Sequence, residues 1–173
     1  VTVLTLMLNG QLPAAASTLD VCAIGCTYAT IQAAVTAAAP TGDTINVKAG
    51  TYDEQVVINI KSLTIAGAGD ATIIAPSTPN KLTLAYTYPA GTFYANTVIS
   101  AVVIATNSTG VTIKDLKIDG TAVATLPAGA GRMAGVLYGE SAGKIQNVTV
   151  QSIKTTGYTE RTNGIDLSAA VNP

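Results

Sequence analysis

Short aliphatic segments follow one another after residue 39, and this pattern limits the fold more than any other feature of the chain. Gly, Asn, Asp, Ser and Lys separate the segments, and none of them has a helical period. The segments at residues 112–118 and 144–150 begin 32 residues apart and share one form, and the segment at 59–65 repeats it. Gly135 and Gly164 open two further similar segments, 29 residues apart. A repeat near 30 residues made of short strands predicts a solenoid of parallel β-strands.

Alignment of the three repeats predicts which side chains stack in the core. One row contains Ile60, Ile113 and Ile145, and a second contains Leu63, Leu116 and Val148. The same alignment places Ser62, Asp115 and Asn147 together at a corner. Asn and Asp tolerate a left-handed backbone and bond to neighbouring backbone groups, so a polar corner column is expected.

One helix is predicted, over Thr27–Ala39. Ile31, Ala34, Val35 and Ala38 fall on one face at helical spacing, and Pro40 and Gly42 follow the segment. We interpret it as an amphipathic helix that packs on an apolar surface.

Composition excludes several classes of function. The 173 residues suffice for one domain with a hydrophobic core, and a net charge of −1 without charge runs gives no signature of nucleic-acid binding. The chain has no histidine, which excludes Ser-His-Asp and Cys-His catalysis within it. No cofactor and no metal site are predicted.

Cys22 and Cys26 are the two cysteines of the chain. A three-residue gap with a glycine can close into a disulfide loop, whereas two thiolates without histidine do not complete a zinc site. We predict a disulfide, and therefore an extracellular or cell-surface protein.

Residues 1–19 are predicted to be a separate apolar segment, and residues 20–173 the β domain. The stretch Val-Thr-Val-Leu-Thr-Leu-Met-Leu suits either the remnant of a secretory signal, together with residues up to Ser17, or an ordered strand. Both alternatives indicate export. The sequons at Asn107 and Asn147 are candidate glycosylation sites, although the corner position predicted for Asn147 offers a structural reason for that residue.

The stretch Tyr28–Ile74, YATIQAAVTAAAPTGDTINVKAGTYDEQVVINIKSLTIAGAGDATII, resembles the opening of pectin-lyase-like proteins, including pectinesterases and pectate lyases. The resemblance implies an all-β, right-handed parallel β-helix with a short α-helical cap at residues 27–39. It is specific for the fold and much less so for an activity, because related openings precede enzymes, adhesins and surface proteins. In this fold, Asp53 and Glu54 are expected to be solvent-facing corner residues.

Catalytic motifs of the resembled enzymes are not found. The Asp-Phe-Ile-Phe-Gly-type motif of pectinesterases is missing, and the only phenylalanine of the chain is Phe93. The remaining candidates for binding or deprotonating an acidic sugar are Arg132, Glu140, Arg161 and Asp166. The alternative is that these are solvated charges outside the coil.

Residues 75–97 interrupt the repeat and are expected to form a loop excursion. They hold four aromatic residues, Tyr86, Tyr88, Phe93 and Tyr94. These are candidate carbohydrate-binding residues, since tyrosine faces stack on sugar rings. Alternatively, the loop covers the flank of the coil.

Two functions are compatible with these features. The first is an extracellular or cell-surface module with a structural, adhesive or self-assembling role, for which a polysaccharide is a candidate partner. The second is the N-terminal part of a polysaccharide-active enzyme. The last segment reads like the middle of a repeat, so the domain is expected to be incomplete there. Head-to-tail self-association through Val1–Gly10 and the C-terminal end is a further hypothesis.

Overall fold

The computed structural model describes residues 15–92, 94–123, 125–154 and 162–169. The predicted segment Val1–Gly10, Phe93 and Arg161 therefore lie outside the described residues. The elements are β1 (Thr18–Val21), α1 (Ile31–Ala37), β2 (Thr41–Val47), β3 (Gly50–Tyr52), β4 (Val56–Asn59), β5 (Ser62–Ala66), η1 (Gly69–Ala71), β6 (Thr72–Ile74), η2 (Pro79–Lys81), β7 (Ala85–Thr87), β8 (Val98–Thr106), β9 (Val111–Asp119), β10 (Arg132–Gly139), β11 (Gly143–Gln151) and β12 (Thr162–Ala169). No helix in the described part of the chain is long and apolar enough to cross a membrane.

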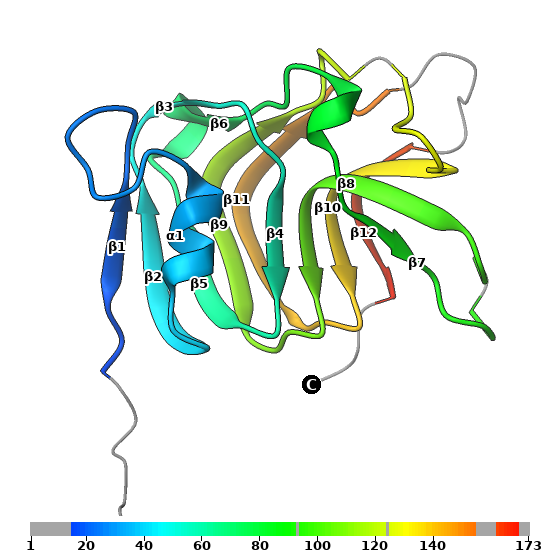
Figure 1. The fold of residues 1–173 in the computed structure, drawn as a ribbon, viewed down its shortest axis with the longest axis horizontal. Coiled ribbons are helices and arrows are strands. Elements are labelled where there is room, and N and C mark those ends of the chain that lie inside the picture. Colours follow the sequence, from blue (N-terminus) through cyan, green and yellow to red (C-terminus); the bar gives the residue numbers. More distant parts are fainter. Residues whose placement is uncertain (1–14, 93, 124, 155–161, 170–173) are drawn as a thin grey trace, which may run out of the picture.

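Two sheets of parallel strands enclose the core (Figure 1). Sheet A has seven strands, in the order β1-β2-β5-β9-β6-β3 with β11 also paired to β9. Sheet B has the order β12-β10-β8-β4, with β7 added to β8. Within this part of the chain every paired strand is parallel except β7, which runs antiparallel to β8. From β8 onward the chain alternates between the sheets, and side chains from both fill the space between them.

The prediction of a right-handed parallel β-helix solenoid was wrong. A solenoid of that kind has a separate strand on each face in every turn, but here the strands merge into two sheets. The long strand β9 pairs with β5 through its first half and with β6 through its second, so sheet A is one curled half barrel. The antiparallel strand β7 also breaks the repeat. The described residues contain one α-helix, α1, which is short and lies inside the range that the sequence predicted.

Single residues with a left-handed backbone explain this curl. Asp115 in β9 and Asn147 in β11 have φ values of 54° and 50°, and the Asn147 amide donates to the Asp115 carboxylate at 2.9 Å. One residue in this conformation bends a strand and lets pairing continue on both sides of the bend. The polar corner that the sequence predicted for these two residues is therefore present, but it bends one sheet instead of separating two.

A second set of stacked left-handed residues lies where the chain passes from sheet B to sheet A. Ile60, Asn107 and Glu140 follow β4, β8 and β10, and their φ values are 55°, 49° and 49°. Backbone bonds from Ile60 N to Thr106 O and from Asn107 N to Gly139 O stack them in register. Ile60 is an unusual member, since a β-branched residue fits this conformation poorly.

This corner also explains an error in the predicted core rows. The pairs Ile113 with Ile145 and Leu116 with Val148 are confirmed by the register of β9 and β11. Ile60 and Leu63, however, do not align with them: Ile65 lies opposite Ile113, and Ile60 is 69% exposed at its corner. Ser62 likewise pairs with Thr41 and is not opposite Asp115. The observed row is Leu19, Ile45, Ile65, Ile113 and Ile145.

Helix α1 covers the edge of sheet B at β4. The Gln32 side chain binds Val57 of β4 as a neighbouring strand would, accepting from its N–H at 2.6 Å and donating to its C=O at 3.2 Å. A covered edge cannot pair with another chain. Ile31, Ala34 and Val35 face the core, as predicted.

Two charged side chains hold α1 at its ends, and both flank β4 in the sequence. The Glu54 carboxylate accepts the N–H groups of Ile31 and Gln32 at 2.8 Å each. The Lys61 ammonium donates to the carbonyls of Val35, Thr36 and Ala38 at 2.5 to 3.0 Å. Each charge has the sign that the helix dipole favours at its end, so β4 and α1 are locked together.

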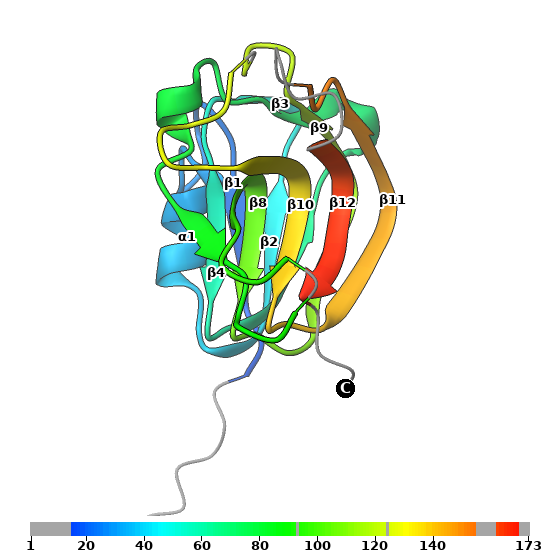
Figure 2. The same cartoon turned by 90° about the vertical axis from the view of Figure 1, so that its right-hand side faces the viewer.

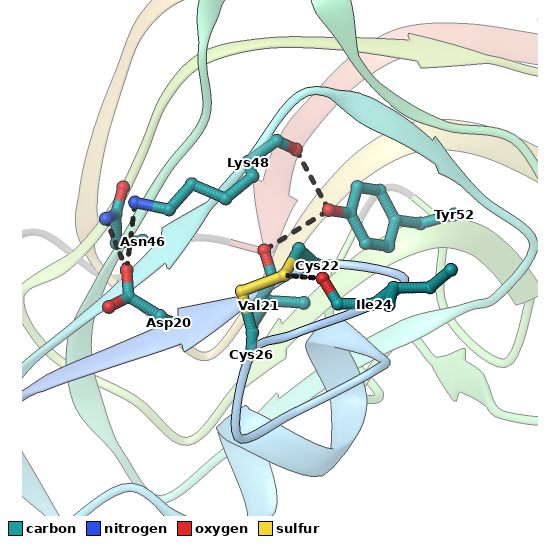
Figure 3. Close-up of a disulfide and its surroundings, with 8 residues drawn as sticks. All are labelled: Asp20, Val21, Cys22, Ile24, Cys26, Asn46, Lys48 and Tyr52. Atoms are coloured by element: carbon teal, nitrogen blue, oxygen red, sulfur yellow. Dashed lines mark hydrogen bonds and ion pairs between the residues drawn. A yellow bond between two sulfur atoms is a disulfide. The ribbon is translucent and has the colours of Figure 1, made fainter.

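The predicted disulfide between Cys22 and Cys26 is formed (Figure 3). Its loop returns the chain to β1, where Cys22 N donates to Tyr28 O and Tyr28 N donates to Asp20 O. Tyr28 therefore occupies part of the outer edge of β1. Because β1 starts at Thr18, the domain boundary predicted between residues 19 and 20 falls inside a strand of sheet A.

Replacing Ile60 by asparagine is expected to stabilise the protein. The change removes a β-branched residue from a left-handed backbone position, and we expect this to raise the free energy of unfolding by about 1 kcal/mol. Little buried area is lost, because the Ile60 side chain is exposed. Urea unfolding gives the free energy. Ile24→Asn is the matched control, since Ile24 is 92% exposed and is not among the residues with positive φ, and it should change stability little. Equal effects of both substitutions would contradict the assigned strain.

Acid is expected to weaken the attachment made by Asp43. Hydrogen bonds from the Ser17 and Ala39 N–H groups and the Ser17 hydroxyl hold the pKa of Asp43 below its usual value. The ionised form therefore stabilises the fold above the unfolded pKa of about 3.9, and this contribution is lost as pH falls through the folded pKa. At neutral pH the wild type should unfold at a higher urea concentration than Asp43→Asn. At about pH 2 the difference between the two urea midpoints should be smaller. A constant difference would refute this linkage.

Candidate functional site

The outer face of sheet B carries a second apolar cluster, and the candidate site residues meet there. Strands β8 and β10 read as nearly continuous hydrophobic runs, which is typical of strands buried on both faces. Their outward residues Ile99, Ala101, Ile104, Ala134 and Leu137 pack with Tyr88. Strand β7 pairs with β8 (Figure 1), and Tyr86 and Tyr94 also pack against this cluster.

Three of the four predicted carbohydrate-binding aromatics form a packed group on this face. The rings of Tyr86 and Tyr88 are 5.6 Å apart in a T-shaped arrangement, and those of Tyr88 and Tyr94 are 5.5 Å apart. Tyr88 is only 1% exposed, while Tyr86 and Tyr94 are half-buried. The tyrosines therefore attach the excursion to sheet B in this structure. Their predicted role in carbohydrate binding stays a prediction.

Arg132 joins the tyrosines to the predicted catalytic residues. Its guanidinium carbon lies 3.8 Å from the centre of the Tyr94 ring, a cation–π contact. Its Nη2 atom is 3.8 Å from the Asp166 carboxylate, and the two side chains are 9% and 2% exposed. Two groups of candidates that the sequence treated separately thus share one site.

The register of β10 and β12 accounts for this meeting. Ala134 pairs with Asn163 and Val136 with Ile165, which is the 29-residue offset that the sequence repeat predicted. Asp166 stands beside Leu137, on the outward face of the sheet. The contact with Tyr94 had no signal in the sequence, because the fold of the excursion over sheet B sets it.

The other two catalytic candidates are placed differently. Glu140 is exposed at its corner, and Arg161 lies outside the described residues. Burial raises the pKa of Tyr86, and the negative charge of Glu140 raises it further. Glu140 therefore influences the tyrosine group through its charge.

Two polar atoms in this site are buried without a hydrogen-bond partner in the part of the chain that the structure describes, Arg132 Nε and the Tyr86 hydroxyl. Such atoms carry a desolvation cost that no contact offsets. The site is therefore buried and polar, and two of its hydrogen-bonding groups have no partner among the described residues.

Two grooves adjoin each other beside α1. They have volumes of about 260 and 540 Å³ and share Thr30, Asp53, Glu54 and Lys81 in their walls. Asp53 is exposed as predicted, and it binds Ser77 and pairs with Lys81 at 3.4 Å. The hydrogen bonds from Ser77 hold the pKa of Asp53 below its usual value.

Glu54 is half-buried, so its prediction as a solvent-facing residue was wrong. No short motif indicates this burial, because the partners of the Glu54 carboxylate are the N–H groups of Gln32 and Ile31, which lie 22 and 23 residues earlier in the chain. Burial raises the pKa of Glu54, while those two donors oppose the increase. The arrangement uses the carboxylate to hold the helix. The described residues contain no group of three or more His, Cys, Asp or Glu side chains that could hold a metal ion.

Comparison with models of protein families finds no match to this chain, and a search of curated proteins finds none either.

Removing the charge of Arg132 is expected to destabilise the protein strongly. In Arg132→Met the buried Asp166 carboxylate loses its cationic neighbour, which typically costs about 3 kcal/mol. The double variant Arg132→Met/Asp166→Leu should recover part of this loss, because it removes both charges. Urea unfolding of both single variants and of the double variant measures the coupling. Strictly additive effects would show that the two charges do not interact.

Proposed function

We propose that this protein is an extracellular or cell-surface module with a structural, adhesive or self-assembling role, and that it is not itself a catalyst. One observation carries the proposal: the charged residues best placed for chemistry are used to hold the fold. Arg132 and Asp166 are buried against each other, and Arg132 is covered by Tyr94. A substrate could reach the face of the Arg132 guanidinium that Tyr94 covers only if the Tyr94 ring moved.

Other charges support the same conclusion. Glu54 and Lys61 hold the two ends of α1, and Asp43 binds Ser17 and Ala39. General acid–base chemistry needs a group within reach of a substrate proton. These groups already contact backbone atoms of the protein.

The disulfide supports a location outside the cytoplasm. Both cysteines of the chain are joined, and such bonds persist in oxidising compartments. A short disulfide loop at the edge of a sheet is compatible with a module that acts in an oxidising compartment.

The second candidate is a polysaccharide-active enzyme similar to pectate lyases or pectinesterases. The unpaired Arg132 Nε and Tyr86 hydroxyl favour it, since a ligand with acceptor oxygens would satisfy both. In that case the segment 85–97 opens for the substrate, and the acidic sugar binds at Arg132.

Incubation with polygalacturonate and calcium distinguishes the two functions. We expect no unsaturated product by ultraviolet absorbance and no fall in viscosity, because Arg132 is covered. Product formed by the wild type and lost in a folded Arg132→Met variant would overturn the proposal and favour the enzyme. Arg132→Met must be compared at a temperature at which circular dichroism shows both proteins to be folded.

A further inference from the structure

The sequon Asn107-Ser108-Thr109 lies at an exposed corner of the molecule. It belongs to the short loop that joins β8 to β9. Figure 2 shows β8 and β10 running to the same end of the molecule, where the chain turns into β9 and β11. Asn107 and Thr109 are both exposed, so this sequon has the surface-loop position that is typical of a glycan acceptor.

The side-chain amide of Asn107 contributes little to the fold. Its Nδ2 atom donates to Asn59 Oδ1 at 3.3 Å, which is longer than an ordinary N–H···O hydrogen bond of about 2.7–3.2 Å. The corner is held by other groups, because Asn107 N donates to Gly139 O and Ser108 N donates to the Ser141 hydroxyl. A sugar attached to Nδ2 therefore leaves the contacts that hold the corner in place.

The second sequon, at Asn147, is part of the sheet. Asn147 lies within β11, and its Nδ2 atom donates to the Asp115 carboxylate at 2.9 Å where sheet A bends. The hydroxyl of Thr149, the last residue of this sequon, donates to Asp70 Oδ1 at 3.1 Å. Both polar groups of the Asn147 sequon are therefore engaged in side-chain hydrogen bonds on a strand, unlike the loop position of Asn107.

An exposed apolar side chain stands beside Asn107. Ile60 and Asn107 are neighbours in the set of stacked left-handed residues, and Ile60 N donates to Thr106 O at 3.2 Å. Ile60 is 69% exposed. The ring of a sugar linked to Asn107 carries C–H groups, and packing them on Ile60 would remove apolar surface from water.

We propose that Asn107 is an N-glycosylation site, used in preference to Asn147, and that the first sugars of the glycan cover Ile60. In the transfer, Nδ2 bonds to the anomeric carbon of a sugar activated as a diphosphate ester. The bond from that carbon to the diphosphate oxygen breaks, the diphosphate leaves, and Nδ2 loses one proton. The inference rests on the extracellular location proposed above, because a cellular transferase attaches such glycans during export.

Expression of the full chain through the secretory pathway of a eukaryotic host tests the site. The intact mass should fall on treatment with peptide-N-glycosidase F, and peptide mapping in heavy-oxygen water should place the label at position 107. Asn107→Gln and Thr109→Ala should both lose the glycan, whereas Thr109→Ser should keep it. Asn147→Gln is the matched control and should keep the mass shift of the wild type.

The contrary results are equally definite. An unmodified Asn107, or Asn147 occupied to an equal or greater extent, would overturn the proposal. A folded, unglycosylated protein that cleaves no polysaccharide would refute this inference and leave the proposed extracellular role standing. Cleavage of polygalacturonate would overturn that role whatever the state of Asn107.

Thermal unfolding followed by circular dichroism tests the contact with Ile60. The glycosylated wild type should unfold about 2 °C above the same chain from a bacterial periplasm, which lacks the glycan. In Ile60→Gly, where glycine fits the left-handed backbone, the difference between the two preparations should disappear. An equal effect of the glycan in both backgrounds would refute the packing on Ile60.

Discussion

The cover that α1 places over the edge of β4 is the interaction on which the architecture depends. Parallel strands must bury both faces of a sheet and also protect its edges. Gln32 satisfies the edge by copying the hydrogen bonds of a strand, and Glu54 and Lys61 fix the helix from either side of β4. A helix of seven residues is too short to be stable alone, so these contacts supply its stability.

Residues with a left-handed backbone set how the strands after α1 bend and turn. Asp115 and Asn147 curl sheet A, while Ile60, Asn107 and Glu140 turn the chain from sheet B to sheet A. Because each column is in register, the inward aliphatic rows remain aligned from β2 to β11. Core packing and corner conformation therefore reinforce each other, and an irregular member such as Ile60 is tolerated by its neighbours.

Local signals in the sequence predicted local structure well. The helix, the disulfide, the pairing of Ile113 with Ile145 and the 29-residue offset between β10 and β12 all follow from spacing and residue type. The solenoid architecture and the placement of Ile60 could not be predicted reliably, because a single left-handed residue shifts a register without changing the hydrophobic pattern. The contacts of Arg132 with Tyr94 and of Glu54 with α1 join distant segments, so no short motif encodes them.

The same physics connects the closed site with the proposed assembly. This chain has few charges, 19 in all, and several of them are committed to internal contacts: Arg132 with Asp166, Glu54 and Lys61 with α1, and Asp43 with Ser17. These five charges therefore do not act at the strand edges, where charged side chains are a common means of preventing edge association. At β12 the exposed residues are Ile165 and Leu167, which favour contact with another apolar surface. Part of the charge of this protein thus holds its own fold while β12 exposes apolar side chains, a distribution that is compatible with the self-assembling role proposed above.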